Sequence, residues 1–182
     1  MRDLPFLAQI DLRGDAGDPR FQAAVRAAIG IEVPSAANTA FGNAERSALW
    51  LGPDEWLIVG REGTERQLVD SLRGALGALH CSVADVSASR AVIEISGARA
   101  REVLMKGCAL DLHPRTFALG RCAQTLFARA QIILWQTENE PPAYRLFVRS
   151  SFAAYLAEWL VIAAVEFIRS KPLSRLPGSV DP

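Results

Sequence analysis

The chain has 182 residues, half of them apolar, which is enough for one compact domain or for two small lobes that share a core. Twenty basic and twenty acidic residues give a formal net charge of zero. No long run of Lys or Arg is present to neutralise phosphates, so nucleic acid is not expected as a partner.

The start of the chain and its cysteines bear on compartment and metal binding. Residues 1–5 contain an acid and a proline where a secretory signal would need a basic start and an apolar run, so we expect a cytoplasmic protein.

The chain has three cysteines, Cys81, Cys108 and Cys122, and no two of them form a Cys-x-x-Cys pair. This spacing fits neither a disulfide framework nor a zinc finger, and His80 and His113 complete no ligand set. We predict reduced thiols and no metal site.

The first half of the chain predicts a strand, a helix, a pair of strands and a second helix, at 8–12, 21–29, 49–59 and 65–76. Asp18 can cap the first helix with Pro19 at its first position, and Gly30 follows its end. Thr64 and Gln67 are spaced as a capping box for the second helix. Each helix has one apolar face, which predicts that both are half-buried.

The hairpin of this half, 48–59, is apolar on both faces and turns at Gly-Pro-Asp-Glu, 52–55. Such a hairpin is typical of a sheet that is covered on both sides. Trp50 and Trp56 could stack a flat ligand there, but paired aromatic residues near a turn more often anchor a core. The core interpretation is therefore favoured.

The second half repeats the same order of elements, at 91–95, 99–106, 132–148 and 152–168. What recurs is apolar spacing and turn residues; among chemically useful residues only the pairs Asp11/Glu94 and Glu32/Asp111 correspond. The repeat therefore describes architecture. It predicts an α+β fold with two lobes and a polar tail, at 1–79, 80–168 and 169–182. The tail, rich in proline and basic residues, is either disordered or an arm that lies on another subunit.

The closing helix is apolar on all sides, and only Glu158 and Glu166 interrupt it. A membrane span is disfavoured because the run is short and each acid would cost about 2.5 kcal/mol or more in lipid. The helix must then be covered by the other lobe or by a partner protein, and both explanations stay open. The candidate partner-interface residues are Trp135, Tyr155, Trp159 and Ile162.

A search for catalytic motifs finds no P-loop, Gly-x-Gly-x-x-Gly, His-Glu-x-x-His or Gly-x-Ser-x-Gly. Cys108 follows a helix C-terminus, whose dipole would raise the thiol pKa, so we interpret it as structural. Asp85, Ser87 and Arg90 could bind a small carboxylate or tie down a turn, and the turn is favoured. We assign no catalytic and no cofactor-binding residue.

Several segments resemble known proteins. Residues 85–87, 91–100 and 103–120 resemble the folate-binding aminomethyltransferase superfamily. Within it, four segments look like the gamma-subunit family of heterotetrameric sarcosine oxidases: 50–57, 106–114, 120–125 and 149–153. The resemblance spans about residues 4–167. It implies paired ferredoxin-like lobes, similar to an aminomethyltransferase folate-binding domain, in agreement with the repeat.

The resemblance also implies a role in a four-subunit flavoenzyme that oxidises sarcosine to glycine and makes hydrogen peroxide, with formaldehyde or methylenetetrahydrofolate as the one-carbon product. FAD, FMN, NAD, tetrahydrofolate and zinc would belong to the alpha, beta and delta subunits, and this chain would pack chiefly on alpha. Aminomethyltransferases place paired acids in the strand that here reads Ala-Gln-Ile-Ile-Leu-Trp, 130–135, which has none; Glu138 and Glu140 are expected in the following turn.

We therefore expect a non-catalytic structural subunit. The competing hypothesis is a stand-alone folate-binding or aminomethyltransferase-like protein that uses a cleft between the lobes, with Trp50, Trp56 or Trp135 stacked on the pterin.

Overall fold

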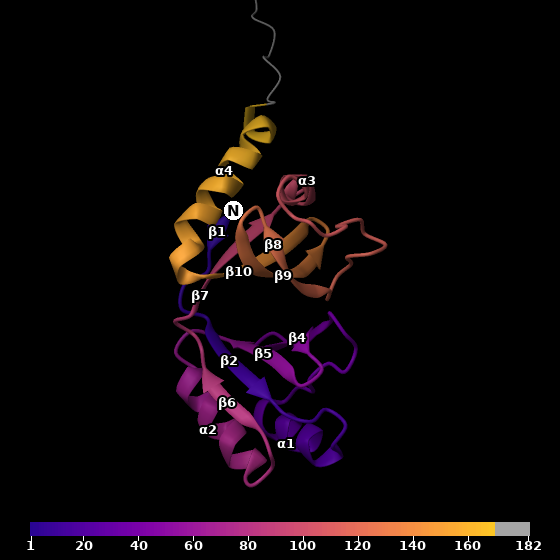
Figure 1. Cartoon of the computed structure of the whole chain (residues 1–182), viewed down its shortest axis with the longest axis vertical. Helices are drawn as coiled ribbons and strands as arrows, with labels where there is room; N and C mark the ends of the chain where they lie inside the picture. The colour runs from indigo at the N-terminus through magenta and orange to yellow at the C-terminus, as the bar shows by residue number, and fades with distance from the viewer. Residues whose placement is uncertain (170–182) are drawn as a thin grey trace, which may run out of the picture.

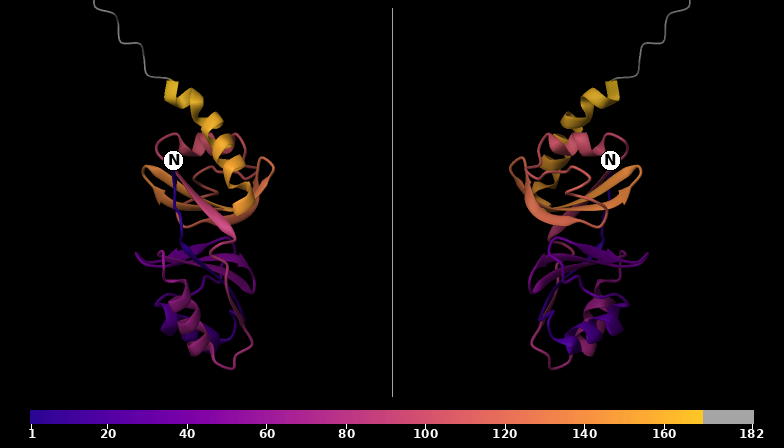
Figure 2. Two further views of the ribbon diagram at one scale, coloured as in Figure 1. Left: turned by 90° about the vertical axis from the view of Figure 1, so that its left-hand side faces the viewer. Right: turned by 90° about the vertical axis from the view of Figure 1, so that its right-hand side faces the viewer.

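The computed structural model describes residues 1–169, so most of the tail expected at 169–182 lies outside the described residues. Two five-stranded antiparallel sheets face each other, and the helices lie on the two outer sides (Figure 1 and Figure 2). The expected α+β class with two lobes is confirmed. The helices are α1 (Pro19–Ile29), α2 (Glu65–Leu76), α3 (Ala100–Met105), the short η1 (Ser150–Phe152) and α4 (Ala153–Arg169).

The two sheets have the same order of strands, which is the structural form of the repeat. The first sheet runs β6 (Ser82–Asp85), β2 (Ala8–Arg13), β5 (Glu55–Gly60), β4 (Ser47–Gly52) and β3 (Ala40–Gly42). The second runs β1 (Arg2–Asp3), β7 (Arg90–Ser96), β10 (Pro142–Arg149), β9 (Ala130–Asn139) and β8 (Cys122–Phe127). Each strand of one sheet therefore has a counterpart at the same place in the other.

The outermost strands cross the lobe boundary expected between residues 79 and 80. β6 follows that boundary but pairs with β2 of the first sheet, and β1 begins the chain but pairs with β7 of the second. Leu4 N–H continues the second pairing by donating to the carbonyl of Val92 at 2.9 Å. Each half thus supplies one edge strand to the other, because an unpaired sheet edge leaves backbone groups without partners.

Local capping follows the sequence for one helix and departs from it for the other. The Asp18 carboxylate accepts from the backbone N–H of Arg20 at 2.9 Å, Pro19 opens α1, and Gly30 ends it with φ of 73°. The capping box expected for α2 is wrong, because the Thr64 hydroxyl donates to the carbonyl of Arg61 at 2.6 Å and caps no helical N–H.

The outer face of each sheet is buried under its helices. Trp56 of β5 is fully buried against α1, with its ring centroid 5.7 Å from that of Phe21, and its indole N–H donates to the carbonyl of Pro34 at 2.8 Å. Trp50, its cross-strand neighbour, is half-buried against the same core. Both tryptophans therefore lie on the outer side of the sheet, and Trp56 anchors the core there.

The inner faces of the sheets pack on each other and form a third core, here called the interlobe core. Its buried members come from both lobes: Ala40, Leu49, Leu51, Leu57, Val59, Val92, Cys122, Ile133 and Phe147. Backbone bonds join the two sheets beside it, since Ala40 N–H donates to Gly120 at 2.7 Å and Cys122 N–H to Asn38 at 3.0 Å. The hairpin of β4 and β5 is covered on both sides, as its sequence predicts.

Phe147 should contribute strongly to stability through the interlobe core. Phe147 is 1% exposed within it, so Phe147→Ala should lower the free energy of unfolding by about 3–5 kcal/mol through lost apolar contact and a cavity. Phe41→Ala is the matched control, because Phe41 is 52% exposed. Urea unfolding followed by tryptophan fluorescence measures both; equal losses for the two variants would contradict this assignment of the core.

Candidate functional site

Helix α4 covers the outer face of the second sheet. Leu156, Leu160 and Ala163 point into the core between the helix and that sheet and are buried. The first lobe lies on the opposite side of the sheet (Figure 2). Of the two explanations left open by the sequence, packing of α4 between the lobes is therefore wrong.

The other side of α4 is apolar and uncovered. Ile162 is 72% exposed, Val161 49% and Val165 37%, and Phe152 of η1 lies exposed at the start of the helix. We call these four side chains the outer face of α4. Large exposed apolar patches on a soluble chain mark surfaces that another molecule covers.

A groove adjoins the outer face of α4. It has a volume of about 400 Å³ and lies between α4 and the segment from β7 to α3. Mainly apolar side chains line it, among them Met1, Ile95, Val103, Leu160, Val161 and Phe167. Val161 belongs to both the groove and the outer face, so the two form one continuous apolar surface.

The predicted interface residues on α4 have different surroundings. Trp159 is half-buried and stands edge-on to Phe127, with ring centroids 5.1 Å apart, so it anchors the helix to its own lobe. Tyr155 is half-buried and contacts the ring of Phe152. Only Ile162 of the predicted residues belongs to the outer face. Phe152, Val161 and Val165 were missed, although the helical spacing of the last two with Ile162 indicates one face.

Trp135 does not join the α4 residues, because it lies on the inner face of the second sheet. The strand register places five side chains in one row across that face: Arg2, Glu94, Arg145, Trp135 and Cys122. The Arg145 guanidinium lies 5.4 Å from the centroid of the Trp135 ring. The structure thus separates Trp135 from the α4 candidates by the thickness of the sheet.

Glu94 organises this row. Its two carboxylate oxygens accept from Arg2 Nε at 2.7 Å and from Arg145 Nε at 3.2 Å, and the residue is 7% exposed. Burial by itself raises the pKa of the Glu94 carboxyl, but the two guanidinium hydrogen bonds outweigh it and hold the pKa below its ordinary value. The corresponding residue of the first lobe, Asp11, has its pKa raised by burial, which Arg13 and Arg90 oppose only in part.

Several residues considered for chemistry have structural partners or are buried. The Asp85 carboxylate accepts from the N–H and the hydroxyl of Ser87, at 2.9 and 2.6 Å, and so ties the turn between the lobes. Burial raises the pKa of the Cys108 thiol, and burial raises the pKa of the Cys122 thiol to about 11, so both are poor nucleophiles at neutral pH. Among residues 1–169 no group of His, Cys, Asp and Glu is placed to hold a metal ion. Glu138 lies within β9 and not in the turn.

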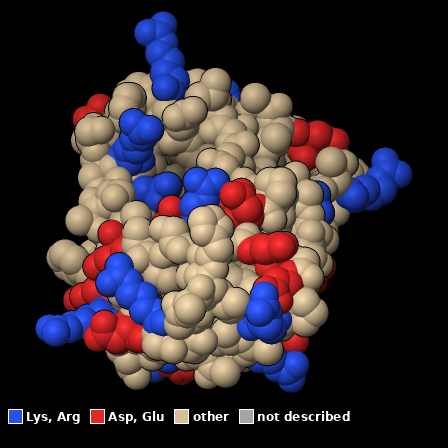
Figure 3. All heavy atoms as spheres, turned by 60° about the horizontal axis from the view of Figure 1, so that its bottom comes forward, with Lys and Arg blue, Asp and Glu red and all other residues tan. Residues whose placement is uncertain are grey.

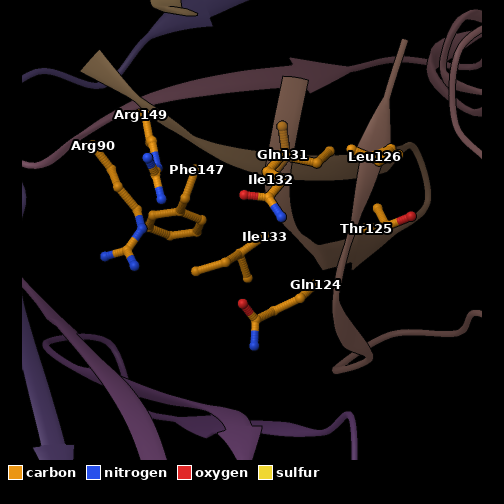
Figure 4. Close-up of a pocket in the computed structure, with 9 residues that line it drawn as sticks. All are labelled: Arg90, Gln124, Thr125, Leu126, Gln131, Ile132, Ile133, Phe147 and Arg149. Carbon is orange, nitrogen blue, oxygen red and sulfur yellow. The ribbon is translucent and has the colours of Figure 1, made fainter. Parts of the chain in front are cut away.

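Arg90 takes no part in the turn that Asp85 and Ser87 tie. Its side chain points into a pocket on the inner face of the second sheet. The pocket has a volume of about 310 Å³, and Arg149 lines it beside Arg90 (Figure 4). Elsewhere, basic and acidic side chains are interspersed over the face shown in Figure 3, which has no broad region of positive charge. That distribution does not resemble a nucleic-acid-binding surface.

Within the described chain, one helical stretch, 150–167, is long and apolar enough to cross a membrane by length and composition alone. Its mean hydropathy is 1.4. In the fold, however, one side of this helix already packs on the second sheet through Leu156 and Leu160.

Comparison with known proteins gives one family. The model described as sarcosine oxidase, gamma subunit family, matches residues 13–166. The chain is 38% identical over 168 residues to sarcosine oxidase subunit gamma of Corynebacterium sp. (strain U-96), covering 92% of this chain and 80% of that one. Sarcosine oxidase subunit gamma of an Arthrobacter species is also 38% identical over 168 residues, with the same coverage of 92% and 80%.

Solved structures give the same relationship. A chain of heterotetrameric sarcosine oxidase from Corynebacterium sp. U-96, in complex with pyrrole 2-carboxylate, matches with a TM-score of 0.84 and 38% identity, covering 91% of this chain and 83% of that one. Aminomethyltransferase T of the glycine cleavage system from Bartonella henselae matches with a TM-score of 0.64 and 13% identity, covering 87% of this chain and 44% of that one. The second likeness concerns the fold alone.

The Glu94 ion pairs should make stability depend on pH. A lowered folded-state pKa means that the contribution of Glu94 is complete above its ordinary pKa of 4.5 and is lost as the pH falls through the folded-state value. Glu94→Gln should therefore lower the free energy of unfolding by about 1–2 kcal/mol at neutral pH and by much less at about pH 3. Urea unfolding at both pH values measures this, with exposed Glu62→Gln as control. A loss independent of pH would contradict the ion-pair role.

Proposed function

We propose that this chain, which belongs to the sarcosine oxidase gamma subunit family, is a non-catalytic structural subunit of a heterotetrameric sarcosine oxidase. The outer face of α4 carries the proposal, because three adjacent aliphatic side chains, Val161, Ile162 and Val165, lie exposed on a helix whose other side is already packed. Burial of such a face against a second protein removes it from water and favours association.

The partner is the large alpha subunit, with the beta and delta subunits completing the assembly. The outer face of α4 and the groove beside it supply one continuous apolar surface. Glu158 and Glu166 lie exposed on the same helix and would need polar partners on the other subunit. The matching surface on alpha is expected to be apolar at its centre.

The chemistry belongs to the partner subunits in this proposal. They hold FAD, FMN, NAD, tetrahydrofolate and zinc, and they oxidise sarcosine to glycine with hydrogen peroxide and formaldehyde or methylenetetrahydrofolate as products. Two of the three thiols of this chain support that division, since burial raises the pKa of Cys108 and of Cys122. The Asp85 and Ser87 side chains are likewise committed to a turn. The complex as a whole acts in the cytoplasm.

A stand-alone folate-binding protein is less well supported. Trp56 is fully buried and cannot stack on a pterin, while Trp50 lies half-buried on the outer side of its sheet. Trp135 is on the inner face, but the Arg145 guanidinium already lies over its ring. Trp50 and Trp56 thus offer no stacking surface between the lobes, whereas Trp135 lines a pocket between the lobes with the Arg145 guanidinium over its ring.

The outer face of α4 is tested in the cells that make the complex. The tagged chain is purified from them, and co-eluting chains, flavin absorbance and sarcosine-dependent peroxide formation are measured. Ile162→Glu should reduce all three about tenfold or more, because a carboxylate would be buried in an apolar interface. Ala75→Glu is the matched control, since Ala75 lies exposed on α2 of the other lobe.

Two results would contradict the proposal. If the parent chain elutes as a colourless monomer without larger chains, the subunit role is wrong. If Ile162→Glu retains its partners as well as Ala75→Glu does, the chain is a subunit that binds through another surface. Circular dichroism of each purified variant separates loss of binding from loss of folding.

A further inference from the structure

The pocket of Figure 4 contains two arginines and no acid. Arg90 and Arg149 line it together with Gln131, Ile133 and Phe147, among others. Arg90 and Arg149 are direct cross-strand neighbours on β7 and β10. Among the described residues, neither makes an ion pair within 4.0 Å; Asp11 acts on Arg90 only through a longer-range electrostatic interaction. Like charges directly opposite each other in a sheet are destabilising unless something neutralises them.

The first lobe shows how the same position is neutralised elsewhere in the molecule. In the first lobe Asp11 lies opposite Leu57, which lies opposite Leu49; in the second lobe Glu94 lies opposite Arg145, which lies opposite Trp135. Leu57 therefore corresponds to Arg145, and Leu49 to Trp135. Counted four residues from these positions, Arg61, which directly follows β5, corresponds to Arg149 of β10, and Glu45, in the turn between β3 and β4, corresponds to Gln131 of β9. Arg61 and Glu45 form an ion pair.

In the second lobe the acid of this pair is replaced by an amide and a second cation is added. Gln131 occupies the place of Glu45, and Arg90 occupies the place of Leu7, which precedes β2 as Arg90 opens β7. Arg61 of the first lobe, which lines a pocket between the lobes with Leu7 and Glu45, is thus paired with a carboxylate, whereas Arg90 and Arg149 line a pocket that has no acid in its lining.

From this difference between the two copies we propose that the Arg90–Arg149 pocket binds a small oxyanion, a phosphate or carboxylate group that takes the place of the missing carboxylate. Two guanidinium groups can each donate paired hydrogen bonds to such a group. The volume of about 310 Å³ is at the lower end for ligand pockets, so the ligand is a small molecule. The apolar floor of Ile133 and Phe147 accommodates a short organic body. The proposal does not depend on the subunit role.

The test measures how accessible individual arginine side chains are to a chemical label in the assembled protein. Phenylglyoxal labels accessible guanidinium groups, and peptide mass spectrometry resolves Arg90 and Arg149 from Arg66, an exposed arginine on α2. Inorganic phosphate and succinate should protect Arg90 and Arg149 with half-protection at about 1 mM or below, whereas chloride at equal ionic strength should not. Comparison of the two probes distinguishes a phosphate site from a carboxylate site. Arg66 should be labelled equally in all conditions.

A single substitution can give the Arg90–Arg149 pocket a carboxylate like the one that Glu45 provides to Arg61 in the first lobe. Gln131→Glu places a carboxylate in the pocket that Arg149 lines, as Glu45 pairs with Arg61 in the first lobe, and should raise the anion concentration for half-protection about tenfold or more. Gln67→Glu on α2 is the matched control and should leave protection unchanged. Gln131 and Gln67 are both exposed, so neither variant should perturb folding.

Three outcomes would overturn the proposal. Protection by phosphate and succinate no greater than by chloride would show charge screening alone. Arg149 unreactive in the assembly without added anion would show that a partner chain covers the pocket. Unchanged protection in Gln131→Glu would show that the anion binds elsewhere.

Discussion

The face-to-face packing of the two sheets determines the rest of the structure. Each lobe has helices on only one side of its sheet, so a single lobe would expose the whole opposite face of its apolar strands to water. The repeat resolves this, because the second copy supplies the cover for the first. The interlobe core buries Leu49 and Leu57 against Ile133 and Phe147, and as a result every helix must lie outside.

This packing also explains why the two copies can differ in chemistry while keeping the same backbone. The inner row of the first lobe contains one acid, Asp11, beside apolar Leu57 and Leu49, whereas the same row of the second lobe contains Glu94, Arg145 and Trp135. Buried charges need partners, and Glu94 has two guanidinium groups. Only the second row therefore holds charges that bridge strands, including β1 from the start of the chain.

The features that could be predicted from the sequence are those that depend on local patterns. Helix ends at Asp18 and Gly30 and the hairpin covered on both sides follow from capping chemistry and from unbroken apolar runs. Edge strands β1, β3 and β6 are two to four residues long and exist only through distant pairing partners, so no local period reveals them. Likewise, Trp135 and α4 cannot be assigned to opposite faces of a sheet until the register is known.

The family assignment and the fold bear on function in different ways. The shared fold with an aminomethyltransferase, at 13% identity, says nothing by itself about chemistry, because one architecture supports many sites. What the fold provides here is rigidity: α4 is fixed to the second sheet by Leu156, Leu160 and the Trp159–Phe127 contact. A surface that is already ordered loses little conformational entropy when a partner binds. In the proposed structural role, the chain therefore contributes to a complex by presenting the outer face of α4 in one fixed geometry.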